Sequence, residues 1–529
     1  MDEMAKPINA IPEPPDVVIE KEEEYAYGFI MEVLTRGLYP MKLHVVREYV
    51  QNAYDAILDL RRQGKDIGDS RIEIKVAPPS IFIFDNGIGM DSKRIAEYRY
   101  VGYSRKITAE SVGFRGIGKL SGLSAAGKII VTTSQVGVPE QYQLVFDAEA
   151  MLSHVETLKE KGENIALNQL IRTYTSLTTC EEDLDAHYTH VELYQIRQDS
   201  NELVDEDKLM EYLSLTAPVE FDTNFLHGDQ IDQWLRDYVV DYDTVSLFVN
   251  GKRVYKPFLE STKPPQNIFV WPENETVGAN GETNPIAFAW YCEHEDKGQF
   301  SDVLRRGLLF RVKNFAVGDN QLPRIHLWRS SPERAFYFIG EIHVCDPEVI
   351  PSADRTNFEQ NASREQLYKQ GSIEISRTLN RVAGTSSDQR RANDFVLQAE
   401  QTVTEVSLDV NNGKVPSELR IPKIVELSKA VENVEKRLKN APQPYQERGK
   451  QVAGNAQTLI QRLDESTEGV KPRSAVYDIK DELKLDQEAR WVYETIISVL
   501  NEVFENKLDI YERLIEEIHK KLRREEEQT

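Results

Sequence analysis

The chain has few of the features that secreted, membrane-spanning or metal-binding proteins require. Only three of its 529 residues are cysteines, and Cys180, Cys292 and Cys345 lack the paired spacing of a disulfide framework or a zinc site. His187 and His190 lie three residues apart, but in a segment that reads as a strand without further ligands. No apolar stretch approaches the length that crosses a membrane, and the polar, Pro-rich beginning has no signal-peptide pattern. These absences predict a cytoplasmic protein without a membrane partner.

Positive charge is also scarce. Lys and Arg total 64 against 88 Asp and Glu, which gives a formal net charge of −24. Proteins that bind nucleic acid usually carry a basic surface, so this balance disfavours nucleic acid as a general partner and leaves room only for a local basic patch. The length predicts about three domains.

Residues 43–62 contain neither Gly nor Pro and repeat apolar residues at helical spacing. Within this predicted helix, Glu48, Asn52 and Asp55 are spaced by four and three residues, so they share one polar stripe. The amide oxygen of Asn52 can ligate magnesium, which prefers oxygen ligands, and Glu48 can accept a proton from water. Taken alone, the same stripe fits the solvated face of an amphipathic helix.

A second block reads FDNGIGM at residues 84–90, after the alternating run RIEIKVAPPSIFIF. Alternation predicts strands, and Asn-Gly predicts a tight turn. Asp85 at the strand end is predicted to accept a hydrogen bond from an adenine amino group, while Gly87 and Gly89 let the backbone approach the base. An ordinary turn with a solvated Asp85 is the alternative.

A third block, VGFRGIGKLSGLSAAG, spans residues 112–127. Gly113, Gly116 and Gly118 precede a helix-compatible run, and backbone amides at such a turn bind phosphate well. A lone glycine pattern is weak as a signal. The three blocks in this order and spacing together predict an ATP site.

These motifs resemble those of the GHKL ATPases, which include DNA gyrase, heat-shock protein 90, histidine kinases and MutL. They are most similar to the heat-shock protein 90 chaperones of the HtpG type, through Glu48–Ala56 (Glu-x-x-x-Asn-Ala-x-Asp-Ala) and Asp85–Met90 (Asp-x-Gly-Ile-Gly-Met). The resemblance departs from the family at Phe114, which is displaced by one insertion, and at Tyr188, which stands where the family has a Gly before its Thr. It implies ATP and Mg²⁺ as ligands, with Asn52 as the magnesium ligand. The ATP-binding residues that it implies are Asn52, Asp55, Asp85, Gly87, Gly89, Met90, Gly113, Phe114, Gly116, Ile117, Gly118, Lys119 and Thr189.

The resemblance also implies two catalytic groups. Glu48 would deprotonate the attacking water, and an Arg of the second domain would face the terminal phosphate. The segment EVIPSADRTNFE offers Arg355 for that role, with Arg364 of the following Ser-Arg-Glu triplet as its rival. A surface Arg paired with nearby carboxylates is an equally ordinary reading of either residue. Further candidates for phosphate contacts are Lys106, Lys119 and Lys313.

The predicted fold class is α+β with a helical C-terminal region. Residues 1–24 form a polar lead-in, and residues 25–225 form a Bergerat-type (GHKL) two-layer α/β sandwich. Residues 240–366, with strand patterns at LFVNGKRVY, IAFAWYC, GLLFRVKNFAVG and AFYFIGEIHV, form a mixed α/β transducer or middle domain. Residues 385–529 are helical. Apolar residues of 489–524 recur as in a long amphipathic helix, which fits a dimeric coiled coil and packing within one bundle equally.

These inferences predict a magnesium-dependent ATPase that works as a clamp similar to heat-shock protein 90. Nucleotide would close a lid, the chain would form a homodimer, and the clamp would act on a protein client or partner. A DNA clamp of the MORC or MutL type, in bacterial defence or DNA maintenance, is the alternative, because the middle region is shorter than that of the chaperones. A histidine kinase is disfavoured, since no His precedes His44 and a kinase needs no base that acts on water.

Overall fold

The computed structural model describes residues 41–65, 70–100, 118–259, 262–273, 284–295, 298–411, 415, 417–439, 443–465, 496, 514 and 518. The chain forms two compact units, Met1–Ser387 and Asp388–Thr529. The predicted lead-in, the glycine block up to Ile117 and most of the predicted last helix lie outside the described residues. Among the described residues, no helix is both long enough and apolar enough to cross a membrane.

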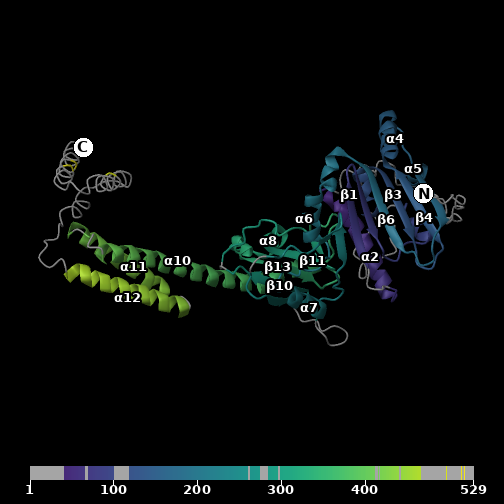
Figure 1. Cartoon of the computed structure of the whole chain (residues 1–529). Helices are drawn as coiled ribbons and strands as arrows, with labels where there is room; N and C mark the ends of the chain where they lie inside the picture. The colour runs from purple at the N-terminus through teal and green to yellow at the C-terminus, as the bar shows by residue number, and fades with distance from the viewer. Residues whose placement is uncertain are drawn as a thin grey trace. The chain divides into compact units, whose positions relative to one another are not determined.

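The first unit contains an eight-stranded sheet with the strand order β5-β4-β3-β6-β2-β1-β7-β8 (Figure 1). All neighbouring strands are antiparallel except β1 and β7, which run parallel. The alternating run predicted as strands is confirmed, because it forms β1 and β2 with two prolines between them. The strands are β1 (Arg71–Ala77), β2 (Ser80–Asp85), β3 (Ala126–Ser134), β4 (Glu140–Asp147), β5 (Thr175–Glu181), β6 (Tyr188–Ile196), β7 (Ser246–Val249) and β8 (Lys252–Val254).

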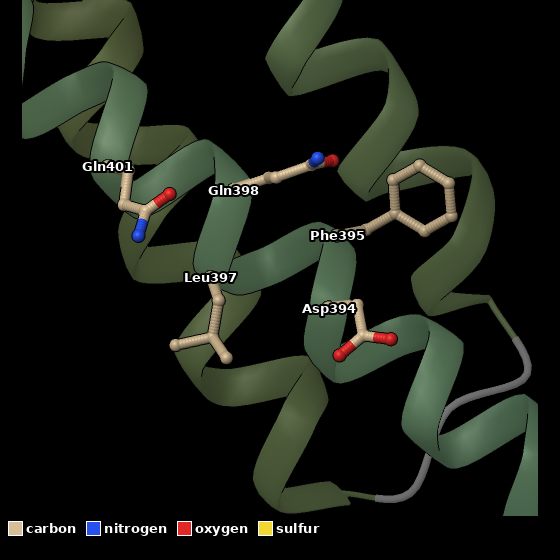
Figure 2. A pocket seen from close by; sticks show the side chains of 5 residues that line it. All are labelled: Asp394, Phe395, Leu397, Gln398 and Gln401. Atoms are coloured by element: carbon tan, nitrogen blue, oxygen red, sulfur yellow. The ribbon is translucent and has the colours of Figure 1, made fainter.

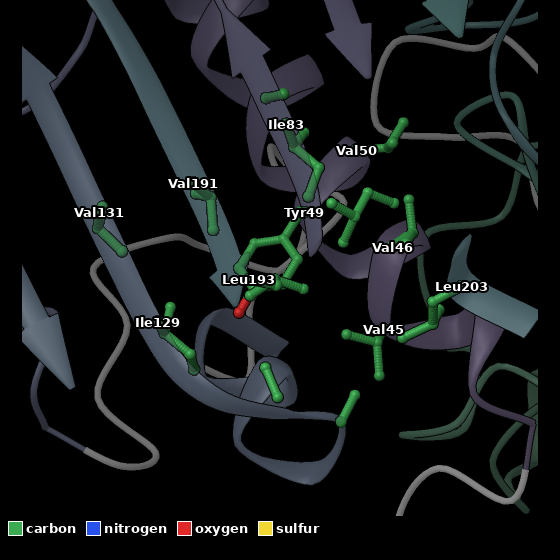
Figure 3. Close-up of a cluster of buried hydrophobic side chains, with 14 of the residues drawn as sticks. Val45, Val46, Tyr49, Val50, Ile83, Ile129, Val131, Val191, Leu193 and Leu203 are labelled. Atoms are coloured by element: carbon green, nitrogen blue, oxygen red, sulfur yellow. The ribbon is translucent and has the colours of Figure 1, made fainter. Parts of the chain in front are cut away.

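Helix α2 (Leu43–Arg62) confirms the predicted helix and lies against this sheet. Its apolar stripe is buried in the main core, where Val46, Tyr49 and Val50 meet Val191 and Leu193 of β6 (Figure 3). Burial of such a stripe fixes which face of the helix remains for polar side chains. The other helices around this sheet are α3 (Ser92–Glu97), the 3-10 helix η2 (Gly118–Ser124), α4 (Ala148–Lys161), α5 (Leu167–Thr173), the 3-10 helix η3 (Gln198–Val204) and α6 (Glu206–Thr216).

The run after the glycine block differs from its prediction. The run KLSGLSAAG is helix-compatible throughout, but its helical part is only the short η2, and Ala126 and Gly127 already belong to β3. Nearby Gly122 explains part of this, because a Cβ there would lie 2.5 Å from the Tyr49 hydroxyl oxygen and the segment therefore packs tightly on α2. The end of the glycine block is thus held against the helix that carries the polar stripe.

The hairpin predicted at LFVNGKRVY is confirmed as β7 and β8, and Asn250 and Gly251 at its turn both have positive φ, as a two-residue turn of this type requires. Its place differs from the expectation, because β7 pairs with β1 and so extends the first sheet. The sequence hairpin was grouped with residues 240–366, yet parallel pairing with a strand about 170 residues earlier leaves no local signal. The domain boundaries themselves stay predictions.

The second sheet has the strand order β12-β11-β13-β10-β9. Three predicted strand runs are confirmed here, although GLLFRVKNFAVG forms a two-stranded hairpin and not one strand. Helix α7 (Gly228–Tyr238) packs in one apolar cluster with this sheet, and α8 (Gln321–Leu327) and α9 (Ala362–Gly371) pack in another. The strands are β9 (Gln266–Val270), β10 (Ala287–Glu293), β11 (Gly307–Val312), β12 (Phe315–Val317) and β13 (Phe338–Val344), with the 3-10 helix η4 (Pro332–Tyr337) before β13.

Beyond α9 the described chain is helical, as predicted. A π-helical turn, η5 (Ser372–Ser376), leads into α10 (Arg377–Asn411), and α11 (Ser417–Leu438) and α12 (Gln443–Glu465) follow. Within the second unit, apolar residues of α10, α11 and α12 share one core, and Arg448 pairs with Glu400 at 2.8 Å. A shallow hollow of about 280 Å³ lies on α10 around Phe395, whose ring is 5.0 Å from the Arg437 guanidinium carbon (Figure 2).

Candidate functional site

The polar stripe of α2 is largely buried. Asp55 is 4% exposed and Gln51 is 1% exposed. Within the described residues, Glu48 Oε1, Asn52 Nδ2 and both amide atoms of Gln51 are buried without a hydrogen-bond partner. A cluster of such atoms is uncommon in folded proteins, where buried polar groups normally bond to protein, water or ligand. A stripe with these buried, unbonded atoms fits a binding face better than a solvated face, and the roles of its residues stay predictions.

Asp85 is the last residue of β2, in the middle of the first sheet. Its Cα partners are Ile72 on β1 and Thr189 on β6, so the sheet holds it from both sides. The side chain is 5% exposed, and its Oδ1 accepts a hydrogen bond of 2.9 Å from the Gly87 amide. A buried carboxylate needs such donors to remain charged. The resemblance implied that Asp85 and Thr189 bind the same ATP. In the structure the two residues are direct partners on neighbouring strands.

The turn after Asp85 is tied to α2 and to β3. The Ile88 amide donates to the Ala56 carbonyl at 3.1 Å, which links the turn to α2. Gly89 has φ +71°, and a Cβ there would lie 1.8 Å from the Ser134 carbonyl oxygen. A Cβ at Gly87 would lie 2.6 Å from the Ala56 Cβ. Both glycines are thus required by the protein's own packing, in addition to the approach to a base that the sequence suggested.

The glycine block enters the described chain at Gly118, next to Glu48. A Cβ on Gly118 would lie 2.0 Å from Glu48 Oε2, so any larger residue would push this carboxylate from its present place. The Lys119 ammonium, predicted to contact phosphate, donates to the Glu97 carbonyl at 3.1 Å and lies 5.8 Å from the centre of the Tyr98 ring. Its role at a phosphate therefore stays a prediction.

Two candidate arginines of the second domain lie in different surroundings. The turn that carries Arg355 reaches α2, because Arg47 Nη2 donates to the Asp354 carbonyl at 2.9 Å. Arg355 has φ +55°, is 7% exposed and lies 6.0 Å from the ring centre of Phe315. Its rival Arg364 stays within its own domain, where it pairs with Glu365 at 2.5 Å. The structure thus brings the Arg355 turn, and not Arg364, to the helix that holds Glu48.

Lys313 lies in a hairpin that reaches α2, because the next residue, Asn314, and Tyr54 of α2 donate to the same Asp243 carbonyl. It occupies the two-residue turn between β11 and β12 with φ +49°. Burial lowers the pKa of Lys313, the carboxylates of Asp241 and Asp55 oppose that shift, and the guanidiniums of Arg62 and Arg355 add to it. The charges of Asp55 on α2 and of Arg355 thus both act on the Lys313 ammonium. Two cations of the second domain therefore gather beside α2.

Residues 39–178 match the family described as histidine kinase-, DNA gyrase B- and HSP90-like ATPase. The first domain is a GHKL ATPase domain. The chain is 28% identical to the chaperone protein HtpG of Methylococcus capsulatus over 180 residues, or 28% of each chain. It is 26% identical to HtpG of Helicobacter acinonychis over 161 residues, or 26% of each chain. With HtpG of Borreliella burgdorferi it shares 21% identity over 298 residues, or 48% of each chain. The chain thus spans half or less of the length of these curated relatives.

Three residues that support the GHKL site carried no sequence signal. Thr133 of β3 is fully buried, and its Oγ1 accepts from the Met90 amide at 3.0 Å and lies 3.4 Å from Thr189 Oγ1. His187 Nδ1 lies 2.9 Å from the Gly87 carbonyl oxygen. Arg47 joins α2 to the Arg355 turn. Only topology brings these residues to the site, because strand alternation gives Thr133 no distinction from its neighbours.

A pH dependence follows from two buried histidines. Burial, with a further contribution from Arg47, lowers the pKa of His44 to about 3, and burial lowers that of His343 to about 4. In the unfolded chain both titrate near 6.5. The unfolded state therefore binds more protons between about pH 6.5 and 4, so stability is complete above this window and falls as the pH falls through it.

We expect His44→Phe to flatten this dependence. Removing one histidine should reduce the slope of the unfolding free energy of the GHKL domain by about 1.4 kcal/mol per pH unit between pH 6 and 4.5, the linkage of one proton. Urea unfolding at pH 7, 6, 5 and 4.5, followed for the wild type and the variant, measures it. Equal slopes for both proteins would show that His44 does not stay neutral in the folded state.

Proposed function

We propose that this protein hydrolyses ATP and uses the reaction to close a dimeric clamp on a protein client. The observation that carries the proposal is the meeting of two features at one place. Helix α2 carries buried polar atoms without a hydrogen-bond partner, and its Ala56 carbonyl accepts from Ile88 in the turn after Asp85. The Arg355 turn of the second domain is bonded to Arg47 of the same helix. The first domain would then hold the nucleotide, and residues of the second domain would complete its binding site.

In this mechanism each group has one task. Asp85 accepts a hydrogen bond from the adenine amino group and so selects the base. Glu48 orients and deprotonates the attacking water, as a general base does. Arg355, with Lys313 beside it, offsets the charge that develops on the terminal phosphate. Because both cations belong to the second domain, hydrolysis depends on the docking of that domain. ATP hydrolysis is thereby coupled to a conformational change.

The donors on α2 fit a magnesium ion. Asn52 offers an amide oxygen one turn from the carboxylate of Glu48, and magnesium typically takes one or two protein oxygens together with phosphate oxygens and water. Among the described residues, no cluster of three or more His, Cys, Asp or Glu could hold a metal alone. When bound, the ion would neutralise charge between the phosphates, and Asn52 would hold it there.

The protein client is favoured by two observations. The curated relatives carry the name of a chaperone, and the net charge of −24 disfavours a nucleic-acid partner. The composition supports a cytoplasmic location. The homodimer is proposed from the amphipathic pattern of residues 489–524, because α10, α11 and α12 pack on one another within the chain. One feature favours the DNA clamp as the second candidate: Lys313 of the second domain is a candidate for a phosphate contact of the kind that the resemblance to the MutL branch implies, and the charge of Asp55 on α2 acts on it.

The test measures ATP turnover by the full chain with Mg²⁺. Arg355→Ala should lower kcat about tenfold and leave the affinity for ATP within about twofold, because one charged hydrogen bond is lost while Lys313 remains. Arg364→Ala is the matched control, since this arginine pairs within its own domain, and it should keep the wild-type rate. No turnover in the wild type would contradict the proposed activity. Equal losses in both variants would remove Arg355 from its role.

A further inference from the structure

A group of charged side chains is fully buried around β13 of the second sheet. Glu341 of β13, Lys256 and Arg311 are at most 1% exposed. Glu341 accepts from Lys256 Nζ at 2.7 Å through Oε1 and at 3.0 Å through Oε2, and it also accepts from Arg311 Nε. Trp290 Nε1 and His343 Nε2 lie 3.2 and 3.0 Å from its Oε2. We call Lys256, Arg311 and Glu341 the buried joint.

Burial of these charges needs a reason beyond stability. Taking ions out of water is costly, and well-packed apolar residues of similar volume are often as stable or more so. What a fully bonded buried ion group provides is one fixed geometry. The buried joint has that property, because Glu341 receives donors from Lys256, Arg311, Trp290 and His343 in one place.

The buried joint links the first domain to the second sheet. Arg311 belongs to β11, yet its Nη2 donates to the Leu215 carbonyl at 2.8 Å, at the end of α6. Lys256 follows β8 of the first sheet, and its amide donates to the Glu220 carbonyl at 2.8 Å. A guanidinium at a helix C-terminus satisfies carbonyls that have no partner within the helix. Since α6 packs on α2, the joint reaches the nucleotide helix from this side.

Asn314 carries the link to α2 from a second side. It is fully buried in the turn between β11 and β12, with φ +61°. Its Oδ1 accepts from Lys256 Nζ at 3.1 Å, and its carbonyl accepts from Arg311 Nη1 at 2.7 Å. Its Nδ2 donates to the Asp243 carbonyl at 2.8 Å, and that oxygen also lies 3.3 Å from the Tyr54 hydroxyl of α2. One side chain thus connects the joint to α2.

The same hairpin holds both cations of the proposed site. Lys313 is the residue before Asn314, so its backbone is fixed by the same bonds. At the other end of β12, the Gly318 amide donates to the Arg355 carbonyl at 2.8 Å. A Cβ on Gly318 would lie 3.0 Å from the Thr356 carbonyl oxygen, so the two turns pack closely. Movement of the β11–β12 hairpin would therefore move Lys313 and the Arg355 turn together.

We propose that Asn314 is a positioning residue that, with the buried joint, fixes the β11–β12 hairpin against α2 and so sets Lys313 and Arg355 at the phosphate end of the nucleotide site. The inference rests on the proposed function for the role of the two cations. The inference adds Asn314 and the buried joint as the groups that position these two cations. A merely structural role for Asn314 would change stability without a specific loss of turnover.

The experiment compares Asn314→Gly with Asn250→Gly in the full chain. Glycine adopts positive φ without strain, so each turn keeps its backbone while the side-chain bonds are lost. Asn250 is a matched control, because it has φ +48° in the turn of the other hairpin and its side chain bonds to Val76 and Glu206 on the surface. Asn314→Gly should lower kcat about tenfold with less than a twofold change in KM for ATP, whereas Asn250→Gly should change neither.

Two further readouts separate positioning from simple destabilisation. In a Lys313→Ala, Arg355→Ala background, Asn314→Gly should cause no further loss of kcat, because the groups that it positions are absent. Losses that multiply would overturn the proposal. Without nucleotide, Asn314→Gly should speed hydrogen exchange at least about tenfold in residues 313–318 and 352–357, and Asn250→Gly should not. Unchanged exchange there would also overturn it, even if the wild type proved unable to hydrolyse ATP.

Discussion

Replacing Asp85 by asparagine is expected to abolish ATP binding by the full chain. The turn should survive the change, because the asparagine Oδ1 can still accept from the Gly87 amide as Asp85 Oδ1 does at 2.9 Å. The amide nitrogen then stands where Oδ2 stood and presents a donor to the adenine amino group, which is itself a donor. A buried polar pair left unsatisfied in this way costs roughly 2 kcal/mol or more, which is at least about thirtyfold in affinity.

Isothermal titration with ATP and Mg²⁺ measures this loss. Asp91→Asn is the matched control, since Asp91 lies in the same connection and caps α3 through a 2.7 Å bond from the Arg94 amide. Asparagine caps helices about as well as aspartate, so this control should bind ATP as the wild type does. Wild-type affinity in Asp85→Asn would show that Asp85 does not contact adenine. Another residue of the pocket would then have to recognise the base.

The sequence predicted the site best where short-range spacing decides the geometry. Asn52 follows Glu48 by four positions, and a helix of 3.6 residues per turn must put them on one face. Asp85 ends a strand whose alternation is plain, and the Thr189 strand then pairs with it. The places of Glu48, Asn52 and Asp85 within their elements needed no tertiary information. The pairing of the Asp85 strand with the distant Thr189 strand did, and only the family resemblance connected those two residues.

Elsewhere the outcome depended on contacts that are distant in the chain. The β7–β8 hairpin was recognised, but its parallel pairing with β1 was not, because nothing near Ser246 points to Arg71. The buried joint was missed for a different reason. Lys and Glu are almost never fully buried unless paired, so sequence reasoning places Lys256 and Glu341 on the surface. Lys256 and Glu341 are 85 residues apart in the sequence, and both can be buried only because they bond to each other.

The arrangement of the second domain explains why such a joint would be useful to an ATPase. Its two candidate cations come from separate turns, yet one hairpin holds both through Asn314 and Gly318. A clamp that must not hydrolyse ATP before closing needs its cations to arrive together. Delivery by one rigid hairpin achieves this with fewer independent motions than two flexible loops would need.

Glu48→Ala should separate nucleotide binding from chemistry. The Glu48 side chain is 12% exposed, its Oε2 lies beside Gly118, and its Oε1 is 3.7 Å from Arg47 Nη2. Asp85 and Asn52 remain in the variant, so ATP should bind within a few fold of the wild-type affinity. Without a base for water, kcat should fall at least about a hundredfold, the usual contribution of a positioned general base. The nucleotide-bound closed form should then accumulate.

Single-turnover hydrolysis of radiolabelled ATP, measured at matched saturation, tests this expectation. Asp59→Ala is the matched control, because this acid lies on the same helix, is about 42% exposed and pairs with Arg62 at 3.5 Å, away from the polar groups that meet the Asp85 turn. It should hydrolyse ATP at the wild-type rate. A rate for Glu48→Ala close to that of Asp59→Ala would remove Glu48 from the mechanism. The chain would then be better described as a nucleotide-binding switch.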